Sequence, residues 1–236
     1  MVIEPIRACV FDAYGTLFDV HSAVARHETA IGAEAAALSR LWRVKQLEYS
    51  WVRSLMRRHA DFWTCTEEAL DFALASHGMA ARADVRGALL EAYRTLDAYP
   101  EAAAVLRQLR AAGLATAILS NGSPAMLDRA VRSAGLAELF DALISIEDAG
   151  IYKPDPAAYR LAVDRLGQPA PAIGFQSSNA WDVAGAAAFG FQVHWINRTG
   201  QPAEYGLGDQ VPQLRSLAEL PRRLGLDRLG LETPPM

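Results

Sequence analysis

The sequence predicts an α/β fold, a Rossmann-like parallel sheet with helices on both faces and an all-helical segment inserted after the first strand. Beyond residue 98, short apolar runs alternate with segments of helical periodicity, as they do when helices cover a parallel sheet. Between residues 18 and 97, helical periodicity dominates and no convincing strand is found. We therefore expect a core domain from residues 1–17 and 98–236 and a helical cap from residues 18–97.

One strand and three helices are expected in the first hundred residues. The apolar run Ile6–Phe11 ends in Asp and a Tyr-Gly-Thr turn, which is typical of a buried strand. One long helix is predicted over Ala33–Met56. A second helix is expected to begin near Thr64, with Glu67 completing a capping box, and a third covers Ala83–Leu96. The apolar face of the long helix is predicted to be Leu38, Leu41, Trp42, Leu47, Trp51 and Leu55.

Four further strands alternate with four helices beyond Pro100. Each of these helices is expected to end near a glycine, which terminates helices readily. The predicted strands are Leu114–Leu119, Ala142–Ser145, Ala172–Gln176 and Gln192–Ile196. The predicted helices are Pro100–Ala112, Pro124–Ala134, Pro156–Leu166 and Trp181–Phe189. The segment beyond Leu220 has little periodicity, and we expect a loose end there.

Composition excludes several classes of function. The net charge of −4 comes without a basic stripe, so no nucleic-acid partner is expected. No run of about 18 apolar residues predicts a membrane span. The first residues lack a signal-peptide pattern, and Cys9 and Cys65 form no CxxC pair, so we expect a protein of the reducing cytoplasm. The five histidines form no HxH or HExxH pattern, so no metal site of that kind is predicted.

Polar side chains follow the predicted strands at their carboxyl ends, where ligands bind in open parallel sheets. Taken singly, Ser and Asn at such positions also serve as helix N-caps, and a lysine before a proline is typical of a solvated loop. The convergence of two carboxylates, one lysine and several hydroxyl and amide groups nevertheless predicts a site. The side chains concerned are Asp12, Tyr14, Thr16, Ser120, Asn121, Lys153, Ser177, Asn179 and Asp182.

Four of these segments resemble the signature loops of the haloacid dehalogenase superfamily. They are similar in detail to its L-2-haloacid dehalogenase (type II) branch, and so is part of the long cap helix. The resemblance runs from about Arg7 to Tyr205, and the ordered set of loops makes it specific. The segments that carry it are Phe11–Leu17, Leu119–Gly122, Tyr152–Asp155, Ser177–Asp182 and, in the cap, Leu41–Ser50.

The resemblance implies hydrolytic dehalogenation of short-chain 2-haloalkanoic acids to 2-hydroxy acids, with inversion and without a cofactor. Asp12 would attack the carbon that bears the halogen from the back, giving an aspartyl ester. Lys153 would keep the Asp12 carboxylate ionised and oriented. Asp182 would activate or orient the water that attacks the ester. The residues implied to assist around the nucleophile are Thr16, Tyr159, Ser177 and Asn179.

The resemblance also implies a set of substrate-binding side chains. Arg43 and Asn121 would hold the departing halide, although an arginine on a long helix is usually solvated. Phe175 would add an apolar wall, but a core position is the simpler interpretation. The Ser120 hydroxyl and nearby backbone N–H groups would bind the substrate carboxylate. The alkyl pocket would be lined by Tyr14, Leu47, Phe62 and Trp181. A core position is an alternative for Trp181 and an equally good interpretation for Phe62.

Two departures from the superfamily pattern separate this sequence from the Mg²⁺-dependent phosphatases. Their first loop resembles Asp-x-Asp, where the second Asp is a general acid, and Tyr14 stands there instead. Their fourth loop supplies two carboxylates for Mg²⁺, whereas here Ser178 replaces the first and only Asp182 remains. A halide leaving group needs no proton, so both losses fit dehalogenation, and no metal is expected.

Several alternatives stay open. One is a metal-dependent small-molecule phosphatase of the same superfamily. Another is a non-catalytic binding protein on this fold, against which the intact set Asp12, Lys153 and Asp182 argues. A third is a dehalogenase that prefers fluoroacetate. The long cap helix predicts a homodimer, as is common among relatives, but its apolar face can equally pack on the rest of the cap. Gln176 lies where an apolar strand residue is expected and has no assigned role.

Overall fold

A sheet of six parallel strands forms the centre of the molecule in the computed structural model, which describes residues 4–208 and 211–226. The strand order is β3-β2-β1-β4-β5-β6, and the predicted α/β class is confirmed. The bounds are β1 (Ala8–Phe11), β2 (Ala115–Ser120), β3 (Ala142–Ser145), β4 (Ile173–Ser177), β5 (Gln192–Ile196) and β6 (Gln213–Leu214). Strand β6 was not predicted, because two residues are too short to show a strand period.

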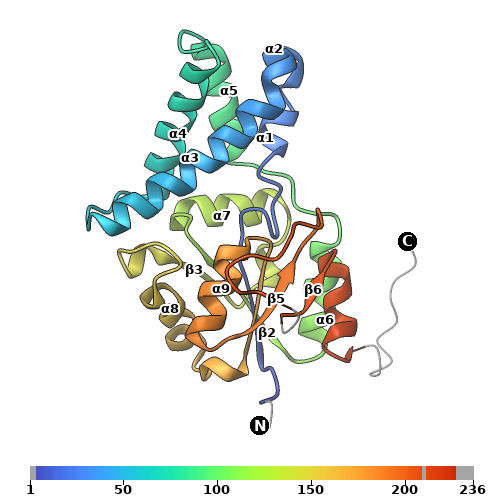
Figure 1. The fold of residues 1–236 in the computed structure, drawn as a ribbon. Helices are drawn as coiled ribbons and strands as arrows, with labels where there is room; N and C mark the ends of the chain where they lie inside the picture. The colour runs from blue at the N-terminus through green and yellow to red at the C-terminus, as the bar shows by residue number, and fades with distance from the viewer. Residues whose placement is uncertain (1–3, 209–210, 227–236) are drawn as a thin grey trace.

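The connections between strands run in two directions, which places helices on both faces of the sheet. From β1 through β2 to β3 the chain steps toward one edge, and from β4 to β5 it steps toward the other. Right-handed crossovers therefore put α6 and α7 on one face and α8 and α9 on the opposite face. Figure 1 shows α6 and α8 on opposite sides of the sheet. These helices are α6 (Ala102–Ala111), α7 (Pro124–Ser133), α8 (Pro156–Leu166) and α9 (Ala180–Phe189), with α10 (Leu220–Arg223) against α6.

Five helices, here called the cap helices, stand together beyond the carboxyl ends of the strands (Figure 1). The longest of them, α3, packs along α4. Their bounds are α1 (Ser22–Ala25), α2 (Glu28–Ile31), α3 (Ala35–Leu55), α4 (Phe62–Ser76) and α5 (Ala83–Tyr93). Short 3₁₀ turns complete the described chain at η1 (Gly32–Glu34), η2 (Ala137–Leu139), η3 (Ile146–Asp148), η4 (Ala170–Ala172) and η5 (Leu217–Glu219). None of the described helices combines the length and apolar character that crossing a membrane requires.

Two chain segments join the cap helices to the sheet, and they pair with each other. An antiparallel bridge links Phe18 to Ala98. Beside it, the backbone N–H of Tyr99 donates to the carbonyl oxygen of Leu17 at 2.9 Å. The chain therefore leaves the core and returns to it at one place, next to the loop that follows β1.

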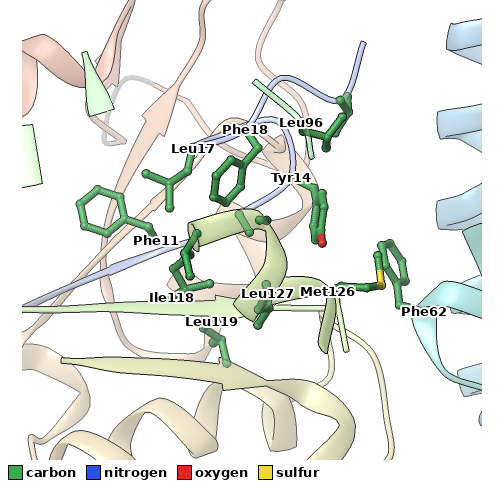
Figure 2. Close-up of a cluster of buried hydrophobic side chains, with 14 of the residues drawn as sticks. Phe11, Tyr14, Leu17, Phe18, Phe62, Leu96, Ile118, Leu119, Met126 and Leu127 are labelled. Atoms are coloured by element: carbon green, nitrogen blue, oxygen red, sulfur yellow. The ribbon is translucent and has the colours of Figure 1, made fainter. Parts of the chain in front are cut away.

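Apolar packing continues from the sheet into the cap without a break. Figure 2 shows Phe11, Leu17 and Phe18 gathered around the end of β1, with Leu127 of α7 beneath them. All four side chains are buried. Phe62 of α4 lies at the edge of this group, with its ring 6.0 Å from that of Tyr14. One continuous core therefore supports both the β1 loop and the cap helices above it.

The structure corrects the predicted start of the second cap helix. Helix α4 begins at Phe62 and is capped by Asp61, whose side chain accepts a hydrogen bond from the backbone N–H of Thr64 at 2.8 Å. The predicted capping box of Thr64 and Glu67 is therefore wrong. An aspartate with extended backbone is a strong N-cap, and the Thr64 hydroxyl also donates to it, at 3.1 Å.

Two further differences from the predictions lie at the end of helix α3 and in the segment beyond Leu220. Leu55, predicted on the apolar face of α3, is 85% exposed, because it stands in the last turn, beyond the region that packs on α4. The segment beyond Leu220 is not entirely a loose end, since it begins with α10, and residues 227–236 lie outside the described part of the chain. By contrast, Ala142–Ser145, Pro156–Leu166 and Gln192–Ile196 have their predicted bounds.

Candidate active site

The carboxylate of Asp12 lies directly after β1, at the carboxyl end of the sheet, and is almost fully buried. One oxygen, Oδ2, accepts hydrogen bonds from Asn179 Nδ2 at 2.8 Å, Thr16 Oγ1 at 3.1 Å and Ser177 Oγ at 3.5 Å. The other, Oδ1, lies 3.3 Å from the ammonium of Lys153. A buried carboxylate needs such donors to stay charged, and here they also fix its orientation.

A tight turn returns the chain to Asp12 after β1. Gly15 has a φ of +99°, and a Cβ added there would come within 3.0 Å of Ser178 Oγ, so the position favours glycine. The turn brings Thr16 back toward the Asp12 carboxylate. The backbone N–H of Ser178 donates to Thr16 Oγ1 at 2.8 Å. The loops after β1 and β4 are thereby locked together.

Lys153 bridges two carboxylates from inside the protein. Its side chain is 0% exposed, and its Nζ lies 3.3 Å from Asp12 Oδ1 and 2.9 Å from Asp182 Oδ2. The backbone N–H of the same residue donates to Asn121 Oδ1 at 3.2 Å, which ties the lysine loop to the end of β2. A buried ammonium is tolerated only with such partners. The three charged groups predicted from the sequence thus form one connected unit.

Asp182 stands in the first turn of α9 and is completely buried. Its Oδ1 accepts a hydrogen bond from the Tyr159 hydroxyl at 2.8 Å. Burial raises the pKa of Asp182 to about 6, the negative charge of Asp12 acts in the same direction, and Lys153 opposes both. Burial also raises the pKa of Tyr159, which therefore keeps its proton and acts as a donor. A carboxylate with a raised pKa is suited to accept a proton from water.

Arg43 approaches the β1 loop from the cap. Its Nη2 donates to the carbonyl oxygen of Tyr14 at 3.1 Å, and its Nη1 donates to Gln46 Oε1 at 2.8 Å. The Tyr14 carbonyl also accepts a bond from Asn179 Nδ2 at 3.4 Å. One oxygen therefore joins the cap arginine to an amide that holds Asp12. Within the part of the chain that the structure describes, the Arg43 guanidinium forms no ion pair with a carboxylate.

Ser120 and Asn121 lie where β2 ends, beside the lysine loop. Ser120 is fully buried, and its Oγ accepts a hydrogen bond from the Gly122 backbone N–H at 3.1 Å. Asn121 is slightly exposed and uses its carbonyl oxygen toward Lys153. A Cβ added at Gly122 would come within 2.7 Å of the Tyr14 ring, so glycine permits this loop to approach the β1 loop closely.

The predicted alkyl-pocket residues fall in two places. Tyr14 and Phe62 lie together, and the Tyr14 ring also stacks on Tyr93 with the centroids 5.7 Å apart. Trp181 instead packs edge-on against Trp51 at 5.3 Å. Leu47 is half-buried on α3. A cavity of about 480 Å³ is lined in part by Trp181, Trp51, Lys153 and Tyr152.

Phe175 is placed with the core aromatics. Its ring lies 5.9 Å from those of Tyr159 and Phe191, and the Lys153 ammonium stands 5.1 Å from its centroid. This position agrees with the simpler core interpretation, and the ring in addition packs against the Lys153 ammonium. Gln176 is the cross-strand neighbour of His194 on β5, and its Nε2 lies 3.3 Å from His194 Nδ1.

Sequence reasoning missed the polar groups behind Arg43. In the sequence, Gln46 belongs to the segment Leu41–Ser50 that resembles the family, and no pattern assigns a role to it, to Tyr93 or to Thr66. The one available signal was the spacing of Gln46, which lies three residues after Arg43 and so on the same side of α3. The partners of Gln46 come from two other helices, α4 and α5, and no spacing along the chain brings them together.

Comparison with known proteins decides the family. Residues 6–190 match the model of the haloacid dehalogenase-like hydrolases. The chain belongs to this family. Within it, (S)-2-haloacid dehalogenase 1 of Pseudomonas sp. (strain CBS-3) is 54% identical over 94% of this chain and 98% of that protein. (S)-2-haloacid dehalogenase 4A of Burkholderia cepacia is 50% identical over 93% and 95%.

Solved structures of dehalogenases share the fold over most of the chain. One dehalogenase crystal structure is 50% identical, with a TM-score of 0.91, and the likeness covers 94% of this chain and 98% of that one. The L-2-haloacid dehalogenase of Xanthobacter autotrophicus, solved with chloropropionic acid covalently bound, is 38% identical, with a TM-score of 0.86 over 93% and 98% of the two chains. The resemblance of the four loops is thus confirmed at the level of the family.

Proposed function

We propose that this chain is an (S)-2-haloacid dehalogenase that hydrolyses short-chain 2-haloalkanoic acids to 2-hydroxy acids with inversion. The observation that carries the proposal is the setting of Asp12, a buried carboxylate held by four side-chain donors and linked through one carbonyl oxygen to the cationic Arg43. Such a site provides a nucleophile, the Asp12 carboxylate, and near it a positive charge, that of Arg43, which can bind a leaving anion. The names of the relatives agree with it.

The first step is a displacement at the carbon that bears the halogen. A carboxylate oxygen of Asp12 forms a bond to that carbon, the carbon–halogen bond breaks, and the halide departs with the electron pair. Arg43 and Asn121 receive the halide. The Ser120 hydroxyl and neighbouring backbone N–H groups hold the substrate carboxylate, and Tyr14 surrounds the alkyl group, helped by Leu47, Phe62 and Trp181. The ring of Phe175 packs against the Lys153 ammonium and so supports the lysine.

The second step is hydrolysis of the aspartyl ester. Water attacks the ester carbonyl carbon of Asp12 and gives one proton to Asp182, and its oxygen becomes a hydroxyl on that carbon. The bond from this carbon to the ester oxygen then breaks, the departing alkoxide takes the proton back from Asp182 and leaves as the 2-hydroxy acid, and Asp12 releases its proton to solvent. Lys153 stays between the two carboxylates throughout and balances the charge that returns to Asp12. Thr16, Ser177 and Asn179 hold the carboxylate oxygen in place, and Tyr159 holds Asp182.

The donor set argues against the phosphatase alternative. Mg²⁺ requires several hard oxygen ligands. The two carboxylates of the site, Asp12 after β1 and Asp182 in the first turn of α9, are both bound to the Lys153 ammonium, and Ser178 stands where a third would be needed. In the described ranges, no group of three or more His, Cys, Asp or Glu side chains is arranged to hold a metal ion.

We also propose how the chain is organised and where it works. Residues 18–97 would act as a cap over a core of residues 1–17 and 98–236. Large apolar side chains are exposed on α3 and α4, and these support a homodimer formed through the cap; they are Val44, Val52, Leu55 and Phe72. Both cysteines are buried free thiols, which suits a cytoplasmic protein.

Halide release tests the proposal directly. Racemic 2-chloropropionate and fluoroacetate are supplied in EDTA, and the unaltered chain is compared with Asp12→Asn. We expect release without metal, and a loss of at least about 10³-fold on substitution, because the nucleophile is removed. The control is Asp19→Asn, which changes an aspartate of the same loop that does not contact the carboxylate cluster. Absence of halide release, together with Mg²⁺-dependent phosphate release from an aryl phosphate, would contradict the proposal.

A further inference from the structure

We propose that Gln46 is a positioning residue for Arg43, which holds the guanidinium with a neutral oxygen and so leaves its positive charge available to an anion. This inference rests on the proposed function, in which Arg43 receives the halide. Gln46 itself does not touch the reacting atoms, and it acts through the arginine.

Gln46 is a buried amide with every polar atom engaged. Its side chain is 0% exposed, on the side of α3 that faces α4 and α5. Nε2 donates to Thr66 Oγ1 at 2.6 Å, and the Tyr93 hydroxyl lies 3.0 Å from Nε2 and 3.2 Å from Oε1. Oε1 accepts from Arg43 Nη1 at 2.8 Å. A fully satisfied polar group inside a packed helix pair fixes one geometry.

Two independent constraints set the direction of this amide. The Thr66 hydroxyl donates to the carbonyl oxygen of Phe62 at 2.7 Å, so it can only accept from Gln46, which places the amide nitrogen on that side. Arg43 has donors and no acceptor, so it requires the amide oxygen. The orientation of Gln46 is therefore determined by its neighbours, and through it so is the place of the guanidinium.

The partners of Arg43 are neutral, in contrast to those of two other arginines, Arg53 and Arg198. It is held by two carbonyl oxygens, those of Gln46 and Tyr14. Arg53 on the same helix is paired with Glu68, and Arg198 is paired with Glu101. A carboxylate beside a guanidinium offsets its charge toward a third ion, whereas an amide does not. Gln46 thus fixes the place of the Arg43 guanidinium without offsetting its positive charge.

The test substitutes the amide by a carboxylate of the same shape. Lactate formation from 2-chloropropionate is measured with increasing sodium bromide at constant ionic strength, for the unaltered chain, Gln46→Glu, Gln46→Met and Ser50→Ala. We expect Gln46→Glu to raise the bromide inhibition constant about tenfold and to lower kcat, because the added carboxylate offsets the positive charge of Arg43. Gln46→Met removes the anchor without adding charge, and a smaller rise is expected. Ser50 is an equally buried polar residue one turn along α3, bonded only to that helix, and its variant should match the unaltered chain.

Each outcome separates a positioning role from a structural one. A loss of fold alone would lower Tm without moving the bromide constant of the molecules that remain folded. A folded Gln46→Glu chain with an unchanged bromide constant would overturn the inference, and if that variant does not fold, an unchanged constant for Gln46→Met does so. Failure of the unaltered chain to form lactate would overturn the proposed function as well, and is thereby distinguished.

Discussion

The core side and the cap side of the site hold their charges in opposite ways. On the core side, the Lys153 ammonium lies between the carboxylates of Asp12 and Asp182, at 3.3 and 2.9 Å. On the cap side, Arg43 is bound by two neutral carbonyl oxygens. The first arrangement balances charge at short range inside the protein, and the second leaves a cation unbalanced within the described chain.

The difference follows the path of charge in the proposed reaction. Two carboxylates and one ammonium carry a net charge of −1 before the displacement. When Asp12 becomes an ester, that negative charge has left with the halide, and the core side is neutral. The departing charge then lies next to Arg43, which has no competing carboxylate. Fixed groups that match the charge distribution of the transition state lower the barrier without rearrangement.

The largest expected effect comes from breaking the balanced side. Lys153→Met leaves two carboxylates facing each other in a buried site, and we expect a loss of about 3–5 kcal/mol in the free energy of unfolding, together with the loss of halide release. Urea unfolding followed by circular dichroism measures the first. The chain's other lysine, Lys45, pairs with the partly exposed Glu48, and Lys45→Met should cost less than about 1 kcal/mol. Equal stabilities of the two variants would contradict the comparison.

Removing the unbalanced cation should affect rate and leave stability nearly unchanged. Arg43→Ala takes away the charge that we propose receives the halide, and we expect kcat/KM for 2-chloropropionate to fall about 10²–10³-fold. Steady-state kinetics and a thermal melt are measured together. Arg40 is an exposed arginine one turn earlier on α3, and Arg40→Ala is the control. A large fall in Tm with Arg43→Ala would show instead that the arginine stabilises the cap.

The smallest effect tests the tuning of the core side by pH. Because burial raises the pKa of Asp182 to about 6 and the base must be unprotonated, activity should be lost as pH falls through about 6. The Tyr159 hydrogen bond favours the charged carboxylate, so Tyr159→Phe should raise the pKa of Asp182 and move this loss to higher pH. The pH profile of kcat is the measurement. Tyr152→Phe alters a buried tyrosine without a hydrogen bond to Asp182 and should leave the profile in place.

The core side was predictable from the sequence and the cap side only in part. Asp12, Lys153 and Asp182 each follow a buried strand, and parallel strands end at one edge of a sheet, so their meeting is a consequence of topology. Helix α8 has its predicted bounds because Asp155 and Pro156 mark its start locally. Local signals of this kind can be recognised in the sequence without knowledge of tertiary contacts.

Tertiary contacts explain what the sequence does not reveal. Gln46 reads as an ordinary polar residue of a helix, and only the packing of α4 and α5 against α3 supplies Thr66 and Tyr93 as its partners. The predicted start of α4 was wrong because Asp61 and Thr64 are both good N-cap residues. The backbone is extended at Asp61, and it is this residue that caps the helix. Leu55 fits the apolar period of α3, yet the helix extends past the surface that would bury it.

The paired linkers at Phe18 and Ala98 have a consequence for the history of such a chain. Strands β1 and β2 pair directly with each other. The cap helices between them are connected to the core by two adjacent chain segments, which pair at Phe18 and Ala98. The ends of the insertion are already close together, so closing the core without it would need only a short turn and little loop-closure entropy. Evolution can therefore lengthen, shorten or exchange the inserted helices, and with them side chains such as Arg43, while the sheet that carries Asp12 keeps its register.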